Sequence, residues 1–298
     1  MRPPRWVEKV RRNAVLETRS LLWRLHGRTR RTVTVTTPQG RLTVYCADQI
    51  IGRKLYCQRA FELDLSQKVI ALLRELGRPV PGGTVLDIGA NMGVISIGLL
   101  RHGWMRRAVA IEPEPGNVAL LRRNVAQNDL SDRVVCVPCA LSDRDGTVDF
   151  ELSGDNYGDH RVRLGSLPSL SERYQESGRR LIEVEMRRLD DVVAGLPAQF
   201  TDDLALIWID TQGHEAHVFR GARSVLARGV PVLAELWPYG LLRAGVSRAE
   251  FCAIAEACWS TYWVLRRGRF FPYPIGLLSL LFDELGDEGD AENVVFTA

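Results

Sequence analysis

The stretch from Val85 to Gly93 constrains the fold of this chain more than any other feature of its 298 residues. It reads Val-Leu-Asp-Ile-Gly-Ala-Asn-Met-Gly. An apolar run over residues 84–88 ends at Gly89, and a helical pattern of apolar residues begins directly after Gly93. A strand, a glycine turn and a helix in this order predict a turn whose backbone N–H groups can approach a bound nucleotide.

Two acidic residues favour a nucleoside that carries positive charge. Asp87 places an anion inside the first strand, where it would repel a phosphate and attract a cation. The next apolar run, residues 108–111, ends in Glu112, 19 residues after Gly93 (112 − 93). An acid there can accept hydrogen bonds from both ribose hydroxyls, although a solvated strand end is an equally open interpretation of Glu112 alone. Since residues 89–93 read G-x-x-x-G and not G-x-G-x-x-G, S-adenosylmethionine fits this site better than NAD.

Four segments of the chain resemble the FkbM-type methyltransferases. The glycine turn is followed by Ile-Glu-Pro-Glu-Pro at 111–115, Val-Pro-Cys-Ala-Leu-Ser-Asp at 137–143 and Ile-Asp-Thr-Gln-Gly-His-Glu at 209–215. The Asp-x-x-Gly-x-Glu pattern of the last segment is the most specific, because the glycine turn is shared by class I methyltransferases in general. The resemblance covers roughly residues 56–240. It implies methylation that depends on S-adenosylmethionine, usually of a hydroxyl on a polyketide, sugar or similar natural product.

Strand and helix patterns alternate along most of the chain. After the first strand, strands are expected near 107–112, 133–138, 204–209 and 231–236, and helices near 92–101, 115–127, 214–227 and 247–257. Two later apolar runs, Tyr262–Leu265 and Asn293–Thr297, would add edge strands. Such alternation predicts an α/β fold: a doubly wound, mainly parallel sheet covered by helices on both faces. With the resemblance, the expected sheet is seven-stranded and of the class I methyltransferase type.

Residues 1–60 are expected to form an N-terminal extension to a methyltransferase domain over 61–298. Residues 1–31 hold ten Lys and Arg against two Glu, a net charge of +8, so the rest of the chain is −5 because the total is +3. Apolar residues recur there at helical spacing, namely Trp6, Val10, Ala14, Leu21 and Leu25. We expect a basic amphipathic helix packed on the domain, with contact to an anionic membrane surface, a partner or the active site left open. Two β-branched runs, 32–37 and 41–46, predict a hairpin.

Composition bears on the partners and the compartment. The basic segment lacks interleaved aromatic residues and the body is acidic, so nucleic-acid binding is not expected. There is neither a signal-peptide pattern nor an apolar run that approaches the roughly 18 residues of a membrane span. Six cysteines in a chain of this length do not suggest a disulfide framework, and we therefore expect a cytoplasmic protein. A homodimer is left open.

The carboxyl ends of the predicted strands locate a cofactor site. Ala140 and Leu141 are expected to form an apolar wall for adenine, and Asn128 or Asp129 could reach its exocyclic amine. The residues expected to bind the cofactor are Asp87, Gly89, Asn91, Gly93, Glu112, Pro113, Asn128, Ala140 and Leu141.

An insertion over about 146–188 is expected to act as a lid from which the methyl acceptor approaches. Acceptor contacts are predicted from its polar segment and from the neighbouring strand ends, at Asn156, Tyr157, Arg161, Gln212 and Glu235.

Methylation of a hydroxyl requires in-line approach and removal of a proton, which a neutral histidine can accept near pH 7. His160 and His214 are the candidates, with Asp210 orienting the base or the acceptor, while His217 is the weaker choice because it lies nearly a turn into a helix. No metal ion is expected, since Thr211 and Gln212 offer few hard ligands beside Asp210. A nicotinamide-dependent oxidoreductase and a non-catalytic nucleoside-binding domain are the alternatives.

Overall fold

The computed structural model describes residues 5–163 and 178–298, and it leaves out the side chains of residues 5–10 and 12. The expected packing of Trp6 and Val10 and the middle of the predicted insertion therefore lie outside the described residues.

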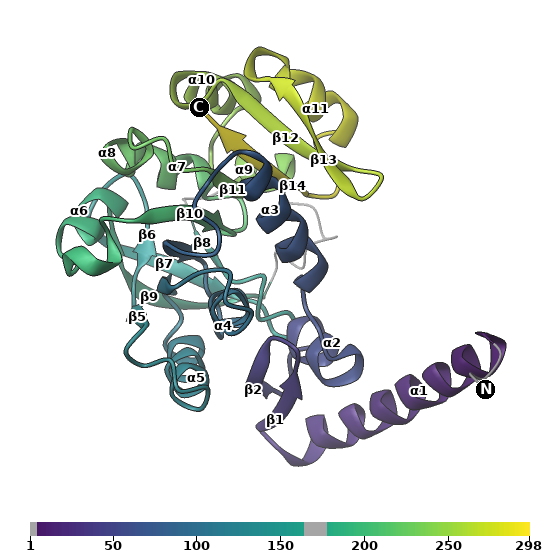
Figure 1. Cartoon of the computed structure of the whole chain (residues 1–298). Coiled ribbons are helices and arrows are strands. Elements are labelled where there is room, and N and C mark those ends of the chain that lie inside the picture. The colour runs from purple at the N-terminus through teal and green to yellow at the C-terminus, as the bar shows by residue number, and fades with distance from the viewer. Residues whose placement is uncertain (1–4, 164–177) are drawn as a thin grey trace.

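A mixed sheet of eight strands forms the centre of the molecule, in the order β13-β12-β14-β11-β10-β3-β4-β5 (Figure 1). Its strands are β3 (Thr84–Ile88), β4 (Arg107–Ile111), β5 (Val134–Val137), β10 (Leu204–Ile209), β11 (Val232–Leu236), β12 (Thr261–Arg266), β13 (Arg269–Pro274) and β14 (Glu292–Thr297). The five from β11 to β5 run parallel, and β14, β12 and β13 pair antiparallel. The doubly wound, mainly parallel α/β fold is confirmed.

The expected count of seven strands is wrong by one, and the expected edge strands are not at the edge. β14 lies between β11 and β12, and β13 forms the edge instead. β13 contains Pro272 and Pro274, which cannot donate to a neighbouring strand. Proline argues against a strand in a sequence pattern, yet it is tolerated at the outer position that β13 takes.

Helices cover both faces of this sheet, as two separate apolar cores show. One core joins the sheet to α3 (Leu63–Glu75), α4 (Val94–Arg101) and α5 (Pro115–Ala126). The other joins it to α6 (Leu189–Ala194), α7 (Glu215–Arg220), α8 (Arg223–Leu226), α9 (Pro238–Arg243), α10 (Arg248–Cys258) and α11 (Leu278–Leu285). The single helix expected over 214–227 is divided into α7 and α8 by a turn at Gly221 and Ala222. The turn requires glycine at 221, because a Cβ there would lie 2.0 Å from the carbonyl oxygen of Ser142.

The predicted insertion contributes to a second, smaller sheet of order β6-β9-β7-β8. It is built from β6 (Ala140–Leu141), β7 (Gly146–Leu152), β8 (Arg161–Val162) and β9 (Arg180–Arg187). The insertion itself supplies the two long strands, β7 and β9. They carry the loop over residues 153–160 to the carboxyl edge of the main sheet, where the site lies.

The N-terminal segment forms α1 (Arg5–Thr29), the hairpin of β1 (Thr32–Thr37) and β2 (Gly40–Tyr45), and α2 (Ile51–Gln58). Figure 1 shows α1 reaching away from the body of the molecule. The prediction that the apolar face of α1 packs on the domain is wrong for its described leucines, since Leu21 is 67% exposed and Leu25 is 54% exposed. Trp23 is buried instead, with its ring 5.3 Å from that of Tyr56 in α2.

Among the described side chains of α1, those that form hydrogen bonds or ring contacts with α2 lie in its carboxyl-terminal half: Arg19, Ser20, Trp23 and His26. The Arg19 guanidinium donates to the carbonyl oxygen of Cys57, at the end of α2, at 3.0 Å. None of the described helices combines the length and the apolar character that a membrane span requires.

Candidate cofactor and active site

The carboxyl ends of β3 and β10 meet where the strand order reverses. From β3 the chain runs outward to β4 and β5, and it then returns to β10 on the other side of β3. In an open doubly wound sheet, ligands bind in the crevice at such a reversal. Here the backbone N–H of Asp210 donates to the carbonyl of Ile88 at 2.9 Å, so the two strand ends form one wall of a site.

Gly89 permits this close approach. Its φ is +81°, and a Cβ there would lie 1.9 Å from the carbonyl oxygen of Asp210. Gly93 has a different role, because it begins α4 with φ +87° and a Cβ there would lie 2.5 Å from the side chain of Leu121 in α5. The first glycine thus shapes the site, whereas the second packs one helix against another and does not line the cofactor pocket.

Glu112 ties the glycine turn to the end of β4. One carboxylate oxygen accepts from the backbone N–H of Asn91 at 2.9 Å, and the other accepts from the N–H of Glu114 at 2.9 Å. The side chain is buried, and this burial raises its pKa to about 7. Glu112 is therefore not a solvated strand end. The oxygen that accepts from Glu114 also accepts from the Asn117 amide at 3.4 Å, whereas the oxygen that accepts from Asn91 keeps a second lone pair for a ribose hydroxyl.

A pocket lies over these residues and brings together many of the expected ones. Those that line it are Gly89, Asn91, Glu112, Pro113, Ala140, Leu141, Tyr157, His160, Asp210 and His214. Ala140 and Leu141 of β6 are buried beside Phe150 of β7, and together they supply the apolar wall that an adenine ring needs. We call this space the cofactor pocket.

Asn128 does not belong to this pocket. Its amide nitrogen donates to the carbonyl of Arg41 at 2.7 Å, and its amide oxygen accepts from the Arg41 N–H at 2.9 Å. The side chain thus fastens the end of α5 to β2 and is unavailable to adenine, which corrects the sequence-based assignment.

Carboxylates gather in a recess directly beside the cofactor pocket. Glu62, Asp87 and Asp210 line it, and we call it the acidic recess. Asp87 accepts from both the N–H and the hydroxyl of Ser96, at 3.0 and 2.5 Å. Burial raises the pKa of Asp87 to about 6 and that of Glu62 to about 7, and in both the nearby Asp210 carboxylate adds to the shift.

The same crowding extends to Glu235, at the end of β11. Burial and the carboxylate of Asp210 raise its pKa well above the usual range. The Gln212 amide donates to Asp210 at 2.6 Å and to Glu235 at 3.0 Å, bridging the two acids. Close carboxylates that raise one another's pKa favour a bound cation, and the sulfonium and ammonium groups of S-adenosylmethionine supply positive charge.

The loop between β10 and α7 is held together by Glu215, the last residue of the Asp-x-x-Gly-x-Glu segment. A single carboxylate oxygen accepts from the N–H and the hydroxyl of Thr211, at 2.9 and 3.0 Å, and from the N–H of Gly213 at 3.3 Å. Gly213 is required there, since a Cβ would lie 2.3 Å from the backbone of Gly240. This segment therefore fixes the position of Asp210.

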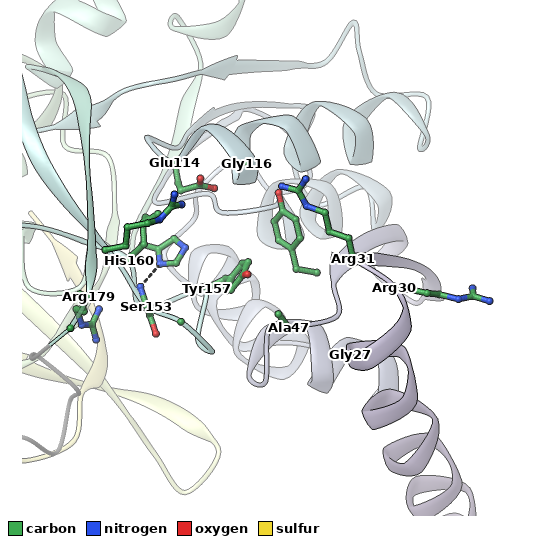
Figure 2. Close-up of a pocket in the computed structure, with 15 residues that line it drawn as sticks. Gly27, Arg30, Arg31, Ala47, Glu114, Gly116, Ser153, Tyr157, His160 and Arg179 are labelled. Atoms are coloured by element: carbon green, nitrogen blue, oxygen red, sulfur yellow. Dashed lines mark hydrogen bonds between the residues drawn. The ribbon is translucent and has the colours of Figure 1, made fainter.

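His160 reaches the cofactor pocket in a form that limits it as a base. Its Nδ1 accepts a hydrogen bond from the Ser153 N–H at 3.0 Å (Figure 2). Because a lone pair on Nδ1 is used in this way, the neutral ring carries its proton on Nε2. Burial, with the charges of Arg179 and Arg180, lowers the His160 pKa to about 4.

His214 begins α7 and is buried at the other side of the pocket. Its Nε2 lies 2.9 Å from the Ser142 hydroxyl, which in turn donates to the carboxylate of Asp143 at 3.3 Å. With the serine proton directed at Asp143, His214 Nε2–H is the donor and Nδ1 keeps a lone pair. No described residue hydrogen-bonds to that Nδ1. Burial holds the His214 pKa well below its usual range, so the ring is neutral.

The remaining expected residues lie beside the pocket and support it. Asn156 accepts from the Gly158 N–H at 3.2 Å and shapes the covering loop, while the carbonyl of Tyr157 accepts from the Asn91 amide at 2.7 Å. Arg161 is buried, 2.9 Å from Asp159. The Gln212 amide links Glu235 to Asp210 by hydrogen bonds to both carboxylates. His217 stacks on His214 with ring centroids 4.4 Å apart.

Sequence reasoning missed Glu62, Asn117 and Phe150. The amide of Asn117 contacts the Glu112 carboxylate at 3.4 Å. Because Asn117 lies only five residues after Glu112, the sequence could have predicted this contact. Glu62 directly precedes a helix, where an acid is ordinarily explained by the helix dipole. Nothing local distinguishes Phe150 from other strand residues.

The comparisons with known proteins agree with this geometry. The family model described as the methyltransferase FkbM domain matches residues 87–238. The 2-O-methyltransferase NoeI of Sinorhizobium fredii is 32% identical over 173 residues, which are 56% of this chain and 66% of that protein. The methyltransferase sdnD of Sordaria araneosa is 29% identical over 155 residues, 46% of this chain and 59% of that protein. The chain thus spans less than two-thirds of the length of either relative.

Two solved structures resemble the chain at low sequence identity. The methyltransferase FkbM from Methylobacillus flagellatus has a TM-score of 0.41 and 15% identity, and covers 72% of this chain and 44% of its own. The O-methyltransferase from Bacillus cereus, in complex with SAH, has a TM-score of 0.42 and 14% identity, covering 80% and 83%. The family model, which matches half of the chain, carries the assignment: the chain belongs to the FkbM methyltransferase family, whose cofactor is S-adenosylmethionine.

Proposed function

We propose that the protein transfers a methyl group to a hydroxyl oxygen of a small molecule, a natural product or a sugar. The observation that carries this proposal is the cofactor pocket. It is lined both by Glu112, which can accept a ribose hydroxyl, and by His214, which can accept a proton. The name of the relative NoeI, a 2-O-methyltransferase, supports oxygen as the acceptor atom. The sequence left a nicotinamide-dependent oxidoreductase as an alternative. The family assignment does not support it, because methyltransferases are a different class of enzyme.

The residues of the site would hold the cofactor by shape and charge. Glu112 would accept a ribose hydroxyl, and Ala140 and Leu141 would lie against adenine. The acidic recess would receive the positively charged end. When bound, the cofactor supplies an electrophilic methyl group, and its sulfur keeps the electron pair of the S–C bond that breaks.

The acceptor hydroxyl loses its proton as its oxygen bonds to the methyl carbon. His214 is the proposed acceptor of that proton, because it lines the cofactor pocket and its Nδ1 has no hydrogen-bond partner among the described residues. His160 is the weaker choice, since its Nδ1 is occupied by the Ser153 N–H. The Ser142 hydroxyl holds the His214 ring, and Asp210, kept in place by Gln212, would orient the substrate.

The experiment is transfer of labelled methyl from S-adenosylmethionine to a panel of hydroxyl compounds, with His214→Asn compared with the native chain. Formation of a methyl ether together with S-adenosylhomocysteine is the expected result. Labelled products that carry the methyl group on nitrogen or carbon alone would overturn O-methylation while leaving the family assignment intact.

We further propose that the protein acts in the cytoplasm on a small molecule. All six cysteines are free, as a reducing compartment requires. A cofactor pocket roofed by the 153–160 loop suits a compact acceptor better than a nucleic acid.

A further inference from the structure

A cavity of about 620 Å³ opens beside the cofactor pocket, and Figure 2 shows the side chains around it. Its walls come from the end of α1, from β2, from the start of α5 and from the insertion. Tyr157 and His160 line both this cavity and the cofactor pocket, so the two spaces meet at these rings. We call it the arginine cavity.

Positive charge dominates its lining. Arg30, Arg31, Arg179 and Arg180 line it, and among the described residues Glu114 supplies the single lining carboxylate. Figure 2 shows the Arg31 side chain directed toward Glu114, whereas that of Arg30 points away from it. Arg179 is held by the carboxylate of Asp159. Over residues 5–163 and 178–298, no carboxylate forms an ion pair with the other three arginines. His160 adds no charge near neutral pH, because its pKa is about 4.

The cavity also presents flat apolar surfaces. The rings of Tyr45 and Tyr157 have centroids 5.0 Å apart, and those of Tyr157 and His160 lie at 5.4 Å. The Arg31 guanidinium lies over Tyr45, 5.8 Å from the ring centroid. The Arg31 side chain also hydrogen-bonds that of Tyr45. Because a guanidinium carries five N–H donors, others remain for a carboxylate or a phosphate.

We propose that the arginine cavity binds the methyl acceptor, and that this acceptor carries an anionic group, a carboxylate, sulfate or phosphate, held by Arg31 and Arg180. The inference rests on the methyltransferase function proposed above and narrows its substrate class. The charged group lies among the arginines, the body of the acceptor lies against Tyr157, and the hydroxyl enters the cofactor pocket where the two spaces join.

The first test uses matched ligands on protein saturated with S-adenosylhomocysteine. Binding of D-glucuronate and of glucose 6-phosphate is measured by saturation-transfer NMR and titration, with methyl glucoside as the neutral partner. The anions are expected to bind at least about tenfold more tightly, since a charge-assisted hydrogen bond contributes roughly 1.5 kcal/mol or more. Equal binding of neutral and anionic ligands, or no binding of either anion, overturns the inference.

The second test removes the charge. The double variant Arg31→Gln with Arg180→Gln is expected to lose the preference for anions. Arg28→Gln, exposed near the end of α1 and outside the cavity, is the matched control that keeps it. Unchanged anion binding in the double variant contradicts the inference.

S-adenosylhomocysteine binding separates the possible failures. If all three proteins bind it, the variants are folded and the outcome concerns only the acceptor. If the native chain does not bind it, the proposed function fails and not merely this inference.

Discussion

The carboxylate of Glu112, at the end of β4, accepts a hydrogen bond from the backbone N–H of Asn91 in the turn after β3, at 2.9 Å. Two neighbouring strand ends are thereby joined through a buried acid whose pKa is raised to about 7. The position suits a ribose, because a carboxylate that is already oriented by the backbone can accept a hydroxyl without reorganising.

Glu112→Ala should weaken binding of S-adenosylhomocysteine at least about tenfold, since a charge-assisted hydrogen bond of roughly 1.5–3 kcal/mol would be lost. Calorimetric titration measures the effect, and circular dichroism checks the fold. Asp132→Ala, in an exposed turn before β5, is the control that should leave affinity unchanged. An unaltered dissociation constant in Glu112→Ala would show that this acid serves only the turn.

Gly89→Ala should prevent the strand ends from meeting. The added Cβ would lie 1.9 Å from the Asp210 carbonyl oxygen, in addition to the strain of a positive φ. Gly103→Ala offers the matched control, because Gly103 has φ +67° and its Cβ would meet nothing within 4 Å. Denaturant unfolding should show a clearly larger loss of stability for Gly89→Ala, and similar losses in both variants would refute the close contact.

Affinity for S-adenosylmethionine should rise with pH between about 6 and 8. Burial raises the pKa of Glu62 to about 7 in the free protein, so near pH 6 its carboxyl is mostly protonated and near pH 8 mostly ionised. A cation is bound better by the ionised form, so binding releases a proton and strengthens as the pH rises. In Glu62→Gln the pH dependence should become flatter, and a profile equal to that of the native chain would exclude this role.

His214→Ala should lower turnover about 10²–10⁴-fold and leave cofactor affinity nearly untouched, because proton removal concerns the acceptor alone. His160→Ala should cost less in turnover, since its Nδ1 is already hydrogen-bonded to Ser153. Steady-state kinetics on a methylated acceptor makes the comparison. Full turnover in His214→Ala between pH 6 and 9 would assign the reaction to positioning alone or to a carboxylate such as Asp210.

Local patterns in the sequence predict the first two strands, the glycine turn and the acid at Glu112, because these features lie within about thirty residues of one another. Other parts depend on contacts between distant segments. The Asn128 amide holds β2 from 87 positions away, and no periodicity in α5 reveals that partner. Glu62 joins the acidic recess, and Phe150 the cofactor pocket, only through tertiary packing.

For α1, the spacing of apolar residues predicts the helix but not the face that it buries. The spacing does not reveal which turns of the helix contact the rest of the molecule. Trp23 packs against Tyr56, while Leu21 and Leu25 face outward.

The most direct test of the whole account is calorimetric titration of the purified chain with S-adenosylhomocysteine and, separately, with NAD. The anionic site formed by Glu112 and the acidic recess predicts micromolar binding of S-adenosylhomocysteine and no heat of binding with NAD. Binding of NAD without any response to S-adenosylhomocysteine would contradict it.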